Sequence, residues 1–111
     1  MDRIRYPVRL DESPSDGAPR LEDSIGAIED RRRVFIGGEV TAAGPRCWTG
    51  GTVFECVLDD GTGQVVLAFL GFPDIPEIRP SVRLWADGTV GRHRGRRLIV
   101  NPYIEIEGID D

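Results

Sequence analysis

An Asp-Asp-Gly-Thr-Gly segment at residues 59–63 separates two apolar runs, residues 53–58 before it and residues 65–70 after it. Asp-Gly supplies the positive φ that a tight turn requires, and the second glycine accommodates a bulge. The residues at every second position from Val65 to Phe69 are Val, Leu and Phe, which matches the period of two of a half-buried strand. These features predict a β-hairpin. An isolated hairpin is barely stable in water, so it must belong to a larger sheet.

The composition favours a single all-β domain. The chain has 111 residues, of which 14 are Gly and 8 are Pro, and a hydrophobic fraction of 40% is enough for a small core. No apolar run approaches the roughly 20 residues of a membrane span. The first residues lack the apolar stretch of a secretory signal. We therefore expect a cytoplasmic protein that does not enter a membrane.

Apolar alternation predicts five strands, at residues 34–41, 52–59, 65–70, 81–90 and 98–106. Residues 72–80 contain three prolines and predict a short connector rather than a helix. Residues 42–51 and the basic segment 91–97 are predicted loops. Gly38 and Gly88 fall within strands, where a glycine allows a sharp bend.

A curved five-stranded sheet is expected to close on itself, which removes exposed edges. A three-stranded meander, a connector and a hairpin follow the strand order of the OB-fold, a five-stranded Greek-key barrel whose loops between strands one and two and between strands four and five hold ligands. We assign residues 21–107 to this domain, residues 1–20 to a flexible acidic arm and residues 108–111 to an acidic tail.

Two segments outside the predicted strands leave alternatives open. Tyr6, Val8 and Leu10 alternate and fit an edge strand within the arm as well as a flexible segment. Residues 21–30 have apolar side chains at helical spacing, with Ser24 placed to cap a helix. They fit one helical turn or an extended segment packed on the sheet.

Three blocks of sequence carry a family resemblance. The first, residues 30–40, contains Asp-Arg-Arg-Arg-Val and Gly-Glu-Val, and the second, residues 58–71, contains Leu-Asp-Asp-Gly-Thr-Gly and Phe-Leu-Gly. The third, residues 88–103, contains Gly-Thr-Val-Gly-Arg-His-Arg-Gly and Asn-Pro-Tyr. In this order they resemble the small stand-alone OB-fold nucleic-acid-binding proteins of actinobacteria. The resemblance to the OB wedge of branched-DNA helicases and to anticodon-binding OB domains is more distant. The resemblance to the actinobacterial OB-fold proteins covers about residues 19–107 and implies binding of single-stranded nucleic acid.

The net charge of −5 is unevenly distributed along the chain. Residues 31–104 carry ten Arg and seven acidic residues. Residues 1–30 carry four Arg and eight acidic residues, and residues 105–111 carry four acidic residues and no basic one. A mildly basic centre is thus bracketed by acidic ends. All 14 basic residues are Arg, a side chain that both pairs with phosphate and stacks on bases.

Single-strand binders combine a positive groove with aromatic platforms for the bases. The candidate nucleic-acid-binding residues lie in the two predicted loops and on the fourth strand: Arg46, Trp48, Arg83, Trp85, Arg92, His93, Arg94, Arg96 and Arg97. Bases are expected to stack on the two Trp side chains while Arg side chains contact phosphates. Alternatively, the basic loop is a solvated hairpin tip, and Trp85 is covered by the N-terminal arm. For residues 31–33 we expect pairing with Glu29 and Asp30.

No catalytic arrangement is present in the sequence. There is no Walker loop and no Gly-x-Ser-x-Gly, and the single histidine has no obvious nucleophile partner. We therefore predict a non-enzymatic protein without a metal or cofactor. Cys47 and Cys56 are expected to be reduced thiols, with Cys56 in the core.

Two functions remain open from the sequence. The first is a module that binds single-stranded DNA or RNA. The second is an OB-fold adaptor that docks a protein partner, for example through its acidic ends, without binding nucleic acid. A related hypothesis is that the acidic ends lie across the basic loops and compete with nucleic acid. The sequence indicates no oligomeric state.

Overall fold

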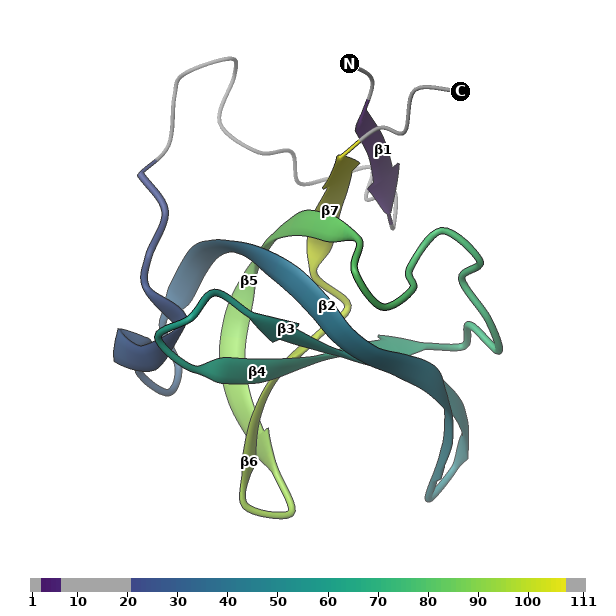
Figure 1. The fold of residues 1–111 in the computed structure, drawn as a ribbon. Helices are drawn as coiled ribbons and strands as arrows, with labels where there is room; N and C mark the ends of the chain where they lie inside the picture. Colours follow the sequence, from purple (N-terminus) through teal and green to yellow (C-terminus); the bar gives the residue numbers. More distant parts are fainter. Residues whose placement is uncertain (1–2, 7–20, 108–111) are drawn as a thin grey trace.

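The computed structural model describes residues 3–6 and 21–107, whose regular secondary structure is strand apart from one 3₁₀ turn (Figure 1). The elements in chain order are β1 (Arg3–Tyr6), the 3₁₀ turn η1 (Ile25–Ala27), β2 (Arg33–Trp48), β3 (Gly51–Asp59), β4 (Gln64–Leu70), β5 (Arg83–His93), β6 (Arg96–Val100) and β7 (Tyr103–Glu107). The prediction of an all-β chain is therefore confirmed. In the described residues, no helix has the length and apolar character needed to span a membrane.

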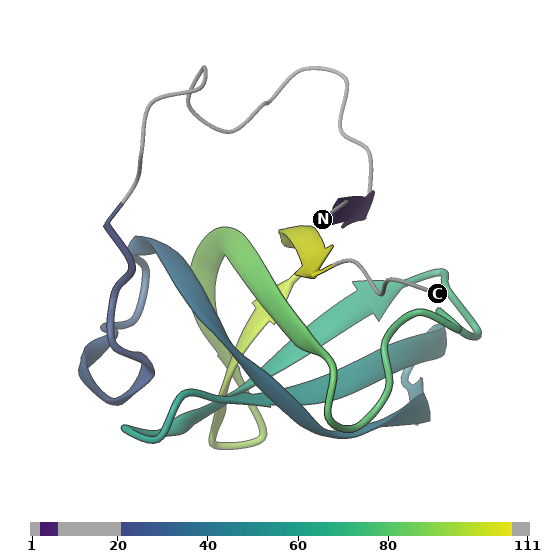
Figure 2. The ribbon, with the colours of Figure 1, turned by 45° about the horizontal axis from the view of Figure 1, so that its top comes forward.

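Five of the strands close a ring, which is seen from two directions in Figures 1 and 2. β2 pairs with β3, β3 with β4, β4 with β6, β6 with β5, and β5 again with β2. These pairings are antiparallel except that of β4 with β6, which is parallel. β7 extends the sheet from β5, and β1 pairs with β7.

β2 is longer than predicted, because the expected loop at residues 42–51 is mostly strand. The strand continues for 16 residues to Trp48 and turns tightly into β3. Its first part, up to Glu39, pairs with β5, and its second part, from Glu39 on, pairs with β3, with a register shift between Val40 and Ala42. In the described chain no strand pairs with the other side of this second part, so Pro45 is tolerated there although it lacks an N–H group. The result is a β2–β3 hairpin that projects from the ring.

The prediction of one continuous fifth strand at residues 98–106 is wrong. This segment is divided into β6 and β7 at Asn101, whose φ of 50° ends the extended conformation, and at Pro102. β6 pairs with β4 and with the end of β5, whereas β7 pairs with the beginning of β5. The predicted basic loop is also mostly strand, because β5 and β6 form a hairpin that turns at residues 94–95.

The core fills the ring with the side chains that the alternation pointed inward. The largest of them include Phe54, Leu58, Leu67 and Phe69. The connector between β4 and β5 contains no helix, as predicted, and its Ile75 and Ile78 side chains are buried in the core. Other members of the core are Ile25, Ile28, Val34, Ile36, Val40, Leu84, Ala86, Val90 and Ile99.

Two glycines allow backbone and side chains to approach closely where the ring curves. A Cβ atom on Gly38 would lie 2.6 Å from the carbonyl oxygen of Asp59. One on Gly88 would lie 2.5 Å from Cγ2 of Ile99. Any side chain at these two positions would therefore force its neighbours to move.

The segment before β2 forms a single 3₁₀ turn between extended residues, and the side chain of Ser24 does not cap it. Ile25 and Ile28 are buried, whereas Leu21 is exposed. In the predicted N-terminal arm, Arg3–Tyr6 forms an edge strand on β7. The rest of the arm, including Val8 and Leu10, and the predicted tail at residues 108–111 lie outside the described residues.

Candidate functional site

The ends of two hairpins meet through an aromatic stack. Trp48 at the end of β2 and His93 at the end of β5 have ring centroids 4.1 Å apart and ring planes 14° apart. Both hairpins project to the same side of the ring in Figure 1. Between them lies a cleft of about 130 Å³, which we call the hairpin cleft; its lining residues are Arg46, Cys47, Trp48, Glu55, His93, Arg94 and Arg96.

Strand register explains why residues so far apart in sequence line one cleft. Opposed residues of an antiparallel pair project from the same face of a sheet. Arg46 is opposed to Val53 and Trp48 to Gly51, so both share the face of Glu55, which lies two residues beyond Val53. This is the outer face of β3, because the alternate residues of β3 fill the core.

Glu55 lines the hairpin cleft and was assigned no role from the sequence. Its Oε2 accepts a hydrogen bond of 2.7 Å from Nε1 of Trp48. Its Oε1 lies 3.4 Å from a terminal nitrogen of Arg96. Only 8% of the Glu55 side chain is exposed. The available signal was a carboxylate between Val53 and Val57 on the outer face of β3.

The basic residues of the β5–β6 hairpin have different partners. Arg92 forms a 2.7 Å ion pair with Asp30, and Arg96 is held by Glu55. Arg97 donates to the backbone carbonyls of Ile28 at 3.2 Å and Gln64 at 3.4 Å, so its guanidinium tethers η1 and the β3–β4 hairpin.

Arg46 and Arg94 have no acidic partner within the part of the chain that the structure describes. Both are exposed and line the hairpin cleft. Arg46 donates to the carbonyl oxygen of Pro45, its neighbour in sequence, at 3.1 Å. These two guanidinium groups are therefore available to an anionic ligand without the loss of an existing ion pair.

Of the pairings predicted for the Arg triplet at residues 31–33, the one between Arg32 and Glu29 is present, whereas Asp30 pairs with Arg92. Arg32 lies 3.7 Å from Glu29. Arg33 pairs with the buried carboxylate of Asp87 at 2.9 Å rather than with an acid next to it in sequence. The Arg33–Asp87 ion pair links the start of β2 to β5.

Arg83 and Trp85 are not brought to the hairpin cleft. They lie near the start of β5, and Trp85 is separated from His93 by about 26 Å of strand. Nε1 of Trp85 donates to Glu22 at 3.2 Å, so this half-buried side chain is covered by the segment that precedes β2. Arg83 pairs with Glu107 at 3.8 Å.

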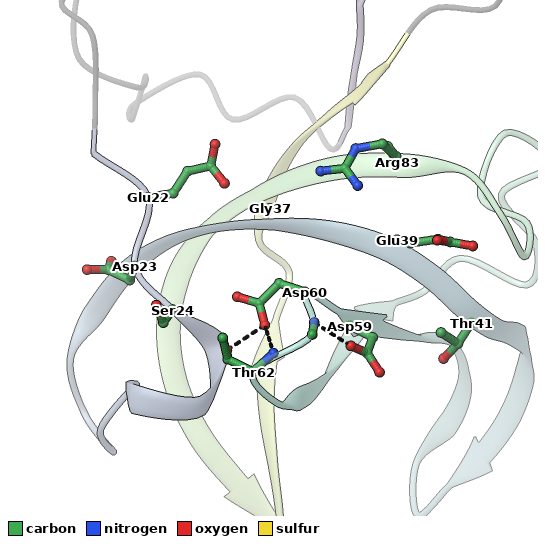
Figure 3. A pocket seen from close by; sticks show the side chains of 11 residues that line it. Glu22, Asp23, Ser24, Gly37, Glu39, Thr41, Asp59, Asp60, Thr62 and Arg83 are labelled. Carbon is green, nitrogen blue, oxygen red and sulfur yellow. Dashed lines mark hydrogen bonds between the residues drawn. The ribbon is translucent and has the colours of Figure 1, made fainter.

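A second hollow, the acidic groove, lies around the middle of β2 and has a volume of about 680 Å³ (Figure 3). Five carboxylates and one guanidinium, that of Arg83, contribute to its lining; the acidic residues are Glu22, Asp23, Glu39, Asp59 and Asp60. It shares no lining residue with the hairpin cleft. Across the described residues, no group of three or more His, Cys, Asp or Glu side chains is arranged to hold a metal ion.

The turn between β3 and β4 borders the acidic groove and is docked on η1. Oδ2 of Asp60 accepts the backbone N–H of Ile25 at 2.9 Å, and its Oδ1 accepts the N–H of Thr62 at 2.8 Å. The hydroxyl of Thr62 in turn accepts the N–H of Gly26 at 2.9 Å. Figure 3 shows the bonds between Asp60 and Thr62. The carboxylate thus satisfies backbone donors that no strand partner reaches.

Removal of the Asp60 charge is expected to lower the free energy of unfolding at neutral pH but not at strongly acid pH. Burial raises the pKa of Asp60, but hydrogen bonds from Ile25, Thr62 and Gly63 together hold it below the ordinary value of 3.8. The folded state therefore binds this proton less readily than the unfolded state, so the stabilisation is present above the unfolded pKa and is lost as pH falls through the folded pKa. Asp60→Asn should lower the unfolding free energy by about 1–2 kcal/mol at neutral pH.

Urea unfolding of Asp60→Asn and the wild type, at neutral pH and below the unfolded pKa, measures this effect. The difference between the two proteins should shrink at the acid pH. Asp74→Asn is the matched control, because it removes the same charge from an exposed position in the connector. An equal difference at both pH values would contradict a role for the Asp60 charge.

Both cysteines are free thiols. Cys56 is buried in the core, as predicted, and its burial, followed by the charge of Glu55, raises its pKa to about 12. It therefore stays protonated at neutral pH and is a poor nucleophile. Cys47 is exposed in the hairpin cleft.

Comparison of the chain with protein-family models, with curated proteins and with solved structures finds no match. The function is therefore inferred from the strand order and from the residues of the hairpin cleft.

Proposed function

We propose that the ring is an OB-fold and that the protein is a non-enzymatic module that binds single-stranded DNA or RNA in the hairpin cleft. The strand order supports this fold: a β2–β3–β4 meander, a connector, and a β5–β6 hairpin in which β6 lies parallel to β4. OB-folds bind oligonucleotides on the face of their second and third strands and with the two adjoining loops. In this chain those features correspond to the outer face of β3 and β4 and to the two hairpins that form the cleft.

The observation that carries the proposal is the Trp48–His93 stack beside two guanidinium groups, those of Arg46 and Arg94, that have no acidic partner among the described residues. The stack offers an aromatic platform for a base, and such stacking tolerates any base. Arg46 and Arg94 supply positive charge for the phosphates on either side of it. The negative net charge does not oppose this role, because the acidic groove is a separate hollow from the hairpin cleft.

The number of available guanidinium groups predicts the salt dependence of binding. Each phosphate neutralised on a single strand contributes about −0.7 to the slope of log K against log salt, so two contacts give a slope of about −1.4. The affinity should then fall about sevenfold between roughly 50 and 200 mM salt. Fluorescence anisotropy of labelled oligo-dT and oligo-U of about 12 nucleotides measures both quantities.

The variant Arg46→Gln/Arg94→Gln should flatten this slope to near zero and abolish measurable binding at physiological salt. Arg79→Gln is a suitable control, because it removes a positive charge from the connector, where the Arg79 side chain bonds to Pro76. Wild-type anisotropy that does not change at low salt with either oligonucleotide would overturn the proposed function.

A further inference from the structure

A carboxylate inside a basic cleft needs an explanation. Glu55 is held on the middle of β3 and is nearly buried, whereas 51% of the Arg96 side chain beside it is exposed. Glu55 is fixed further by the 2.7 Å hydrogen bond from the Trp48 indole. Arg96 is the first residue of β6, next to the hairpin turn, and its contact to Glu55 is long, at 3.4 Å. Of the two partners, Arg96 is the one free to turn outward.

A phosphate group and a carboxylate use the same donors. Both accept charge-assisted hydrogen bonds from guanidinium groups, so a guanidinium that is drawn toward a carboxylate has part of its charge neutralised and is less favourably placed for a phosphate. In the structure, Arg96 donates to Glu55. The phosphates of a strand bound in the hairpin cleft would therefore compete with this carboxylate for the charge and the position of Arg96.

We propose that Glu55 competes with the phosphates of the bound strand for Arg96 and thereby limits the affinity of the hairpin cleft. This inference rests on the proposed function. Because a half-exposed ion pair is weak, the competition lowers the affinity by a small factor and leaves binding readily reversible. Glu55 acts through Arg96 and is a positioning residue rather than a ligand contact.

The variant Glu55→Gln tests the proposal, because glutamine keeps an oxygen acceptor for the Trp48 indole and removes the charge. Its affinity for oligo-dT should rise about two- to fivefold. The salt slope should become steeper by about 0.7, the contribution of one further phosphate contact. Glu107→Gln is the matched control, because it removes the same charge and releases Arg83 outside the hairpin cleft.

The double variant Glu55→Gln/Arg96→Gln should lose the gain in affinity and in slope. The gain should also be the same for oligo-dT and oligo-dC. A selective loss of oligo-dC binding in Glu55→Gln would overturn the proposal, because it would mean that Glu55 accepts hydrogen bonds from base amino groups. A measurement that does not depend on this variant is Arg96→Gln alone, which should weaken binding less than Arg94→Gln; an equal loss would also count against the competition.

The outcomes separate this inference from the proposed function. If the wild type binds with the expected slope and Glu55→Gln changes nothing, the competition is overturned and the proposed function stands. If the wild type binds and Glu55→Gln binds more tightly with the steeper slope, the competition is supported. If neither protein binds, both proposals fail.

Discussion

The variant Phe69→Ala is expected to lose about 3–5 kcal/mol of unfolding free energy. The Phe69 side chain is fully buried, and its ring centroid lies 6.4 Å from that of Phe54 on β3. The truncation removes apolar contacts and leaves a cavity in a ring that has one small core. Since small domains are stable by about 5–15 kcal/mol, this is a large fraction of the total. Urea unfolding followed by circular dichroism measures the loss.

The next residue of the same strand is a matched control. Leu70 projects from the opposite face of β4, and 42% of its surface is exposed. Leu70→Ala should therefore cost less than about 1 kcal/mol. Similar losses for the two variants would contradict the placement of the two faces of β4.

The variant Trp48→Ala is expected to weaken oligonucleotide binding about ten- to hundredfold, because stacking on an aromatic side chain contributes about 1–3 kcal/mol per base. Trp85→Ala is the control: it removes the other indole, which bonds to Glu22 on a different part of the surface. Anisotropy at a fixed low salt concentration measures both affinities.

The intrinsic fluorescence of the two Trp side chains also tests where the oligonucleotide binds. In Trp85→Phe, the remaining emission comes from Trp48 and should be quenched when oligo-dT saturates the protein. In Trp48→Phe, the remaining emission comes from Trp85 and should not change. Quenching of Trp85 with no effect on Trp48 would place the nucleic acid away from the hairpin cleft.

The ring strands were predictable because their alternation is strong and their turns carry distinctive residues. The β3–β4 hairpin follows directly from Asp-Gly between two apolar runs. The second part of β2 was not predictable in the same way, because Gly44 and Pro45 are typical of loops. They are accommodated on a strand whose outer edge has no partner in the described chain.

The sequence contained a signal for the break between β6 and β7, but the continuing alternation of apolar residues masked it. Asn-Pro is a turn-forming dipeptide, and Asn101 does adopt a left-handed conformation. Apolar residues on both sides nevertheless continue the alternation, which made a single strand the simpler interpretation.

Which Arg side chains are available could not be read from the sequence. Their partners lie far along the chain: Asp30 for Arg92, and Glu55 for Arg96. The basic segment 91–97 looks uniform in sequence, yet it contains paired, tethered and available guanidinium groups. Only the tertiary arrangement distinguishes them. For the same reason, the cleft role of Glu55 was not apparent.

The long β2 has a consequence for the order in which the chain folds. β2, β3 and β4 can pair as soon as they are synthesised, because they follow one another through tight turns. The ring closes only when β5 reaches back to β2 across about 50 residues, and such distant pairing is slow. Until then, the meander has open edges on β2 and β4, and open edges are templates for pairing with other chains. The stage most vulnerable to aggregation is therefore this meander before β5 and β6 arrive, not the finished ring.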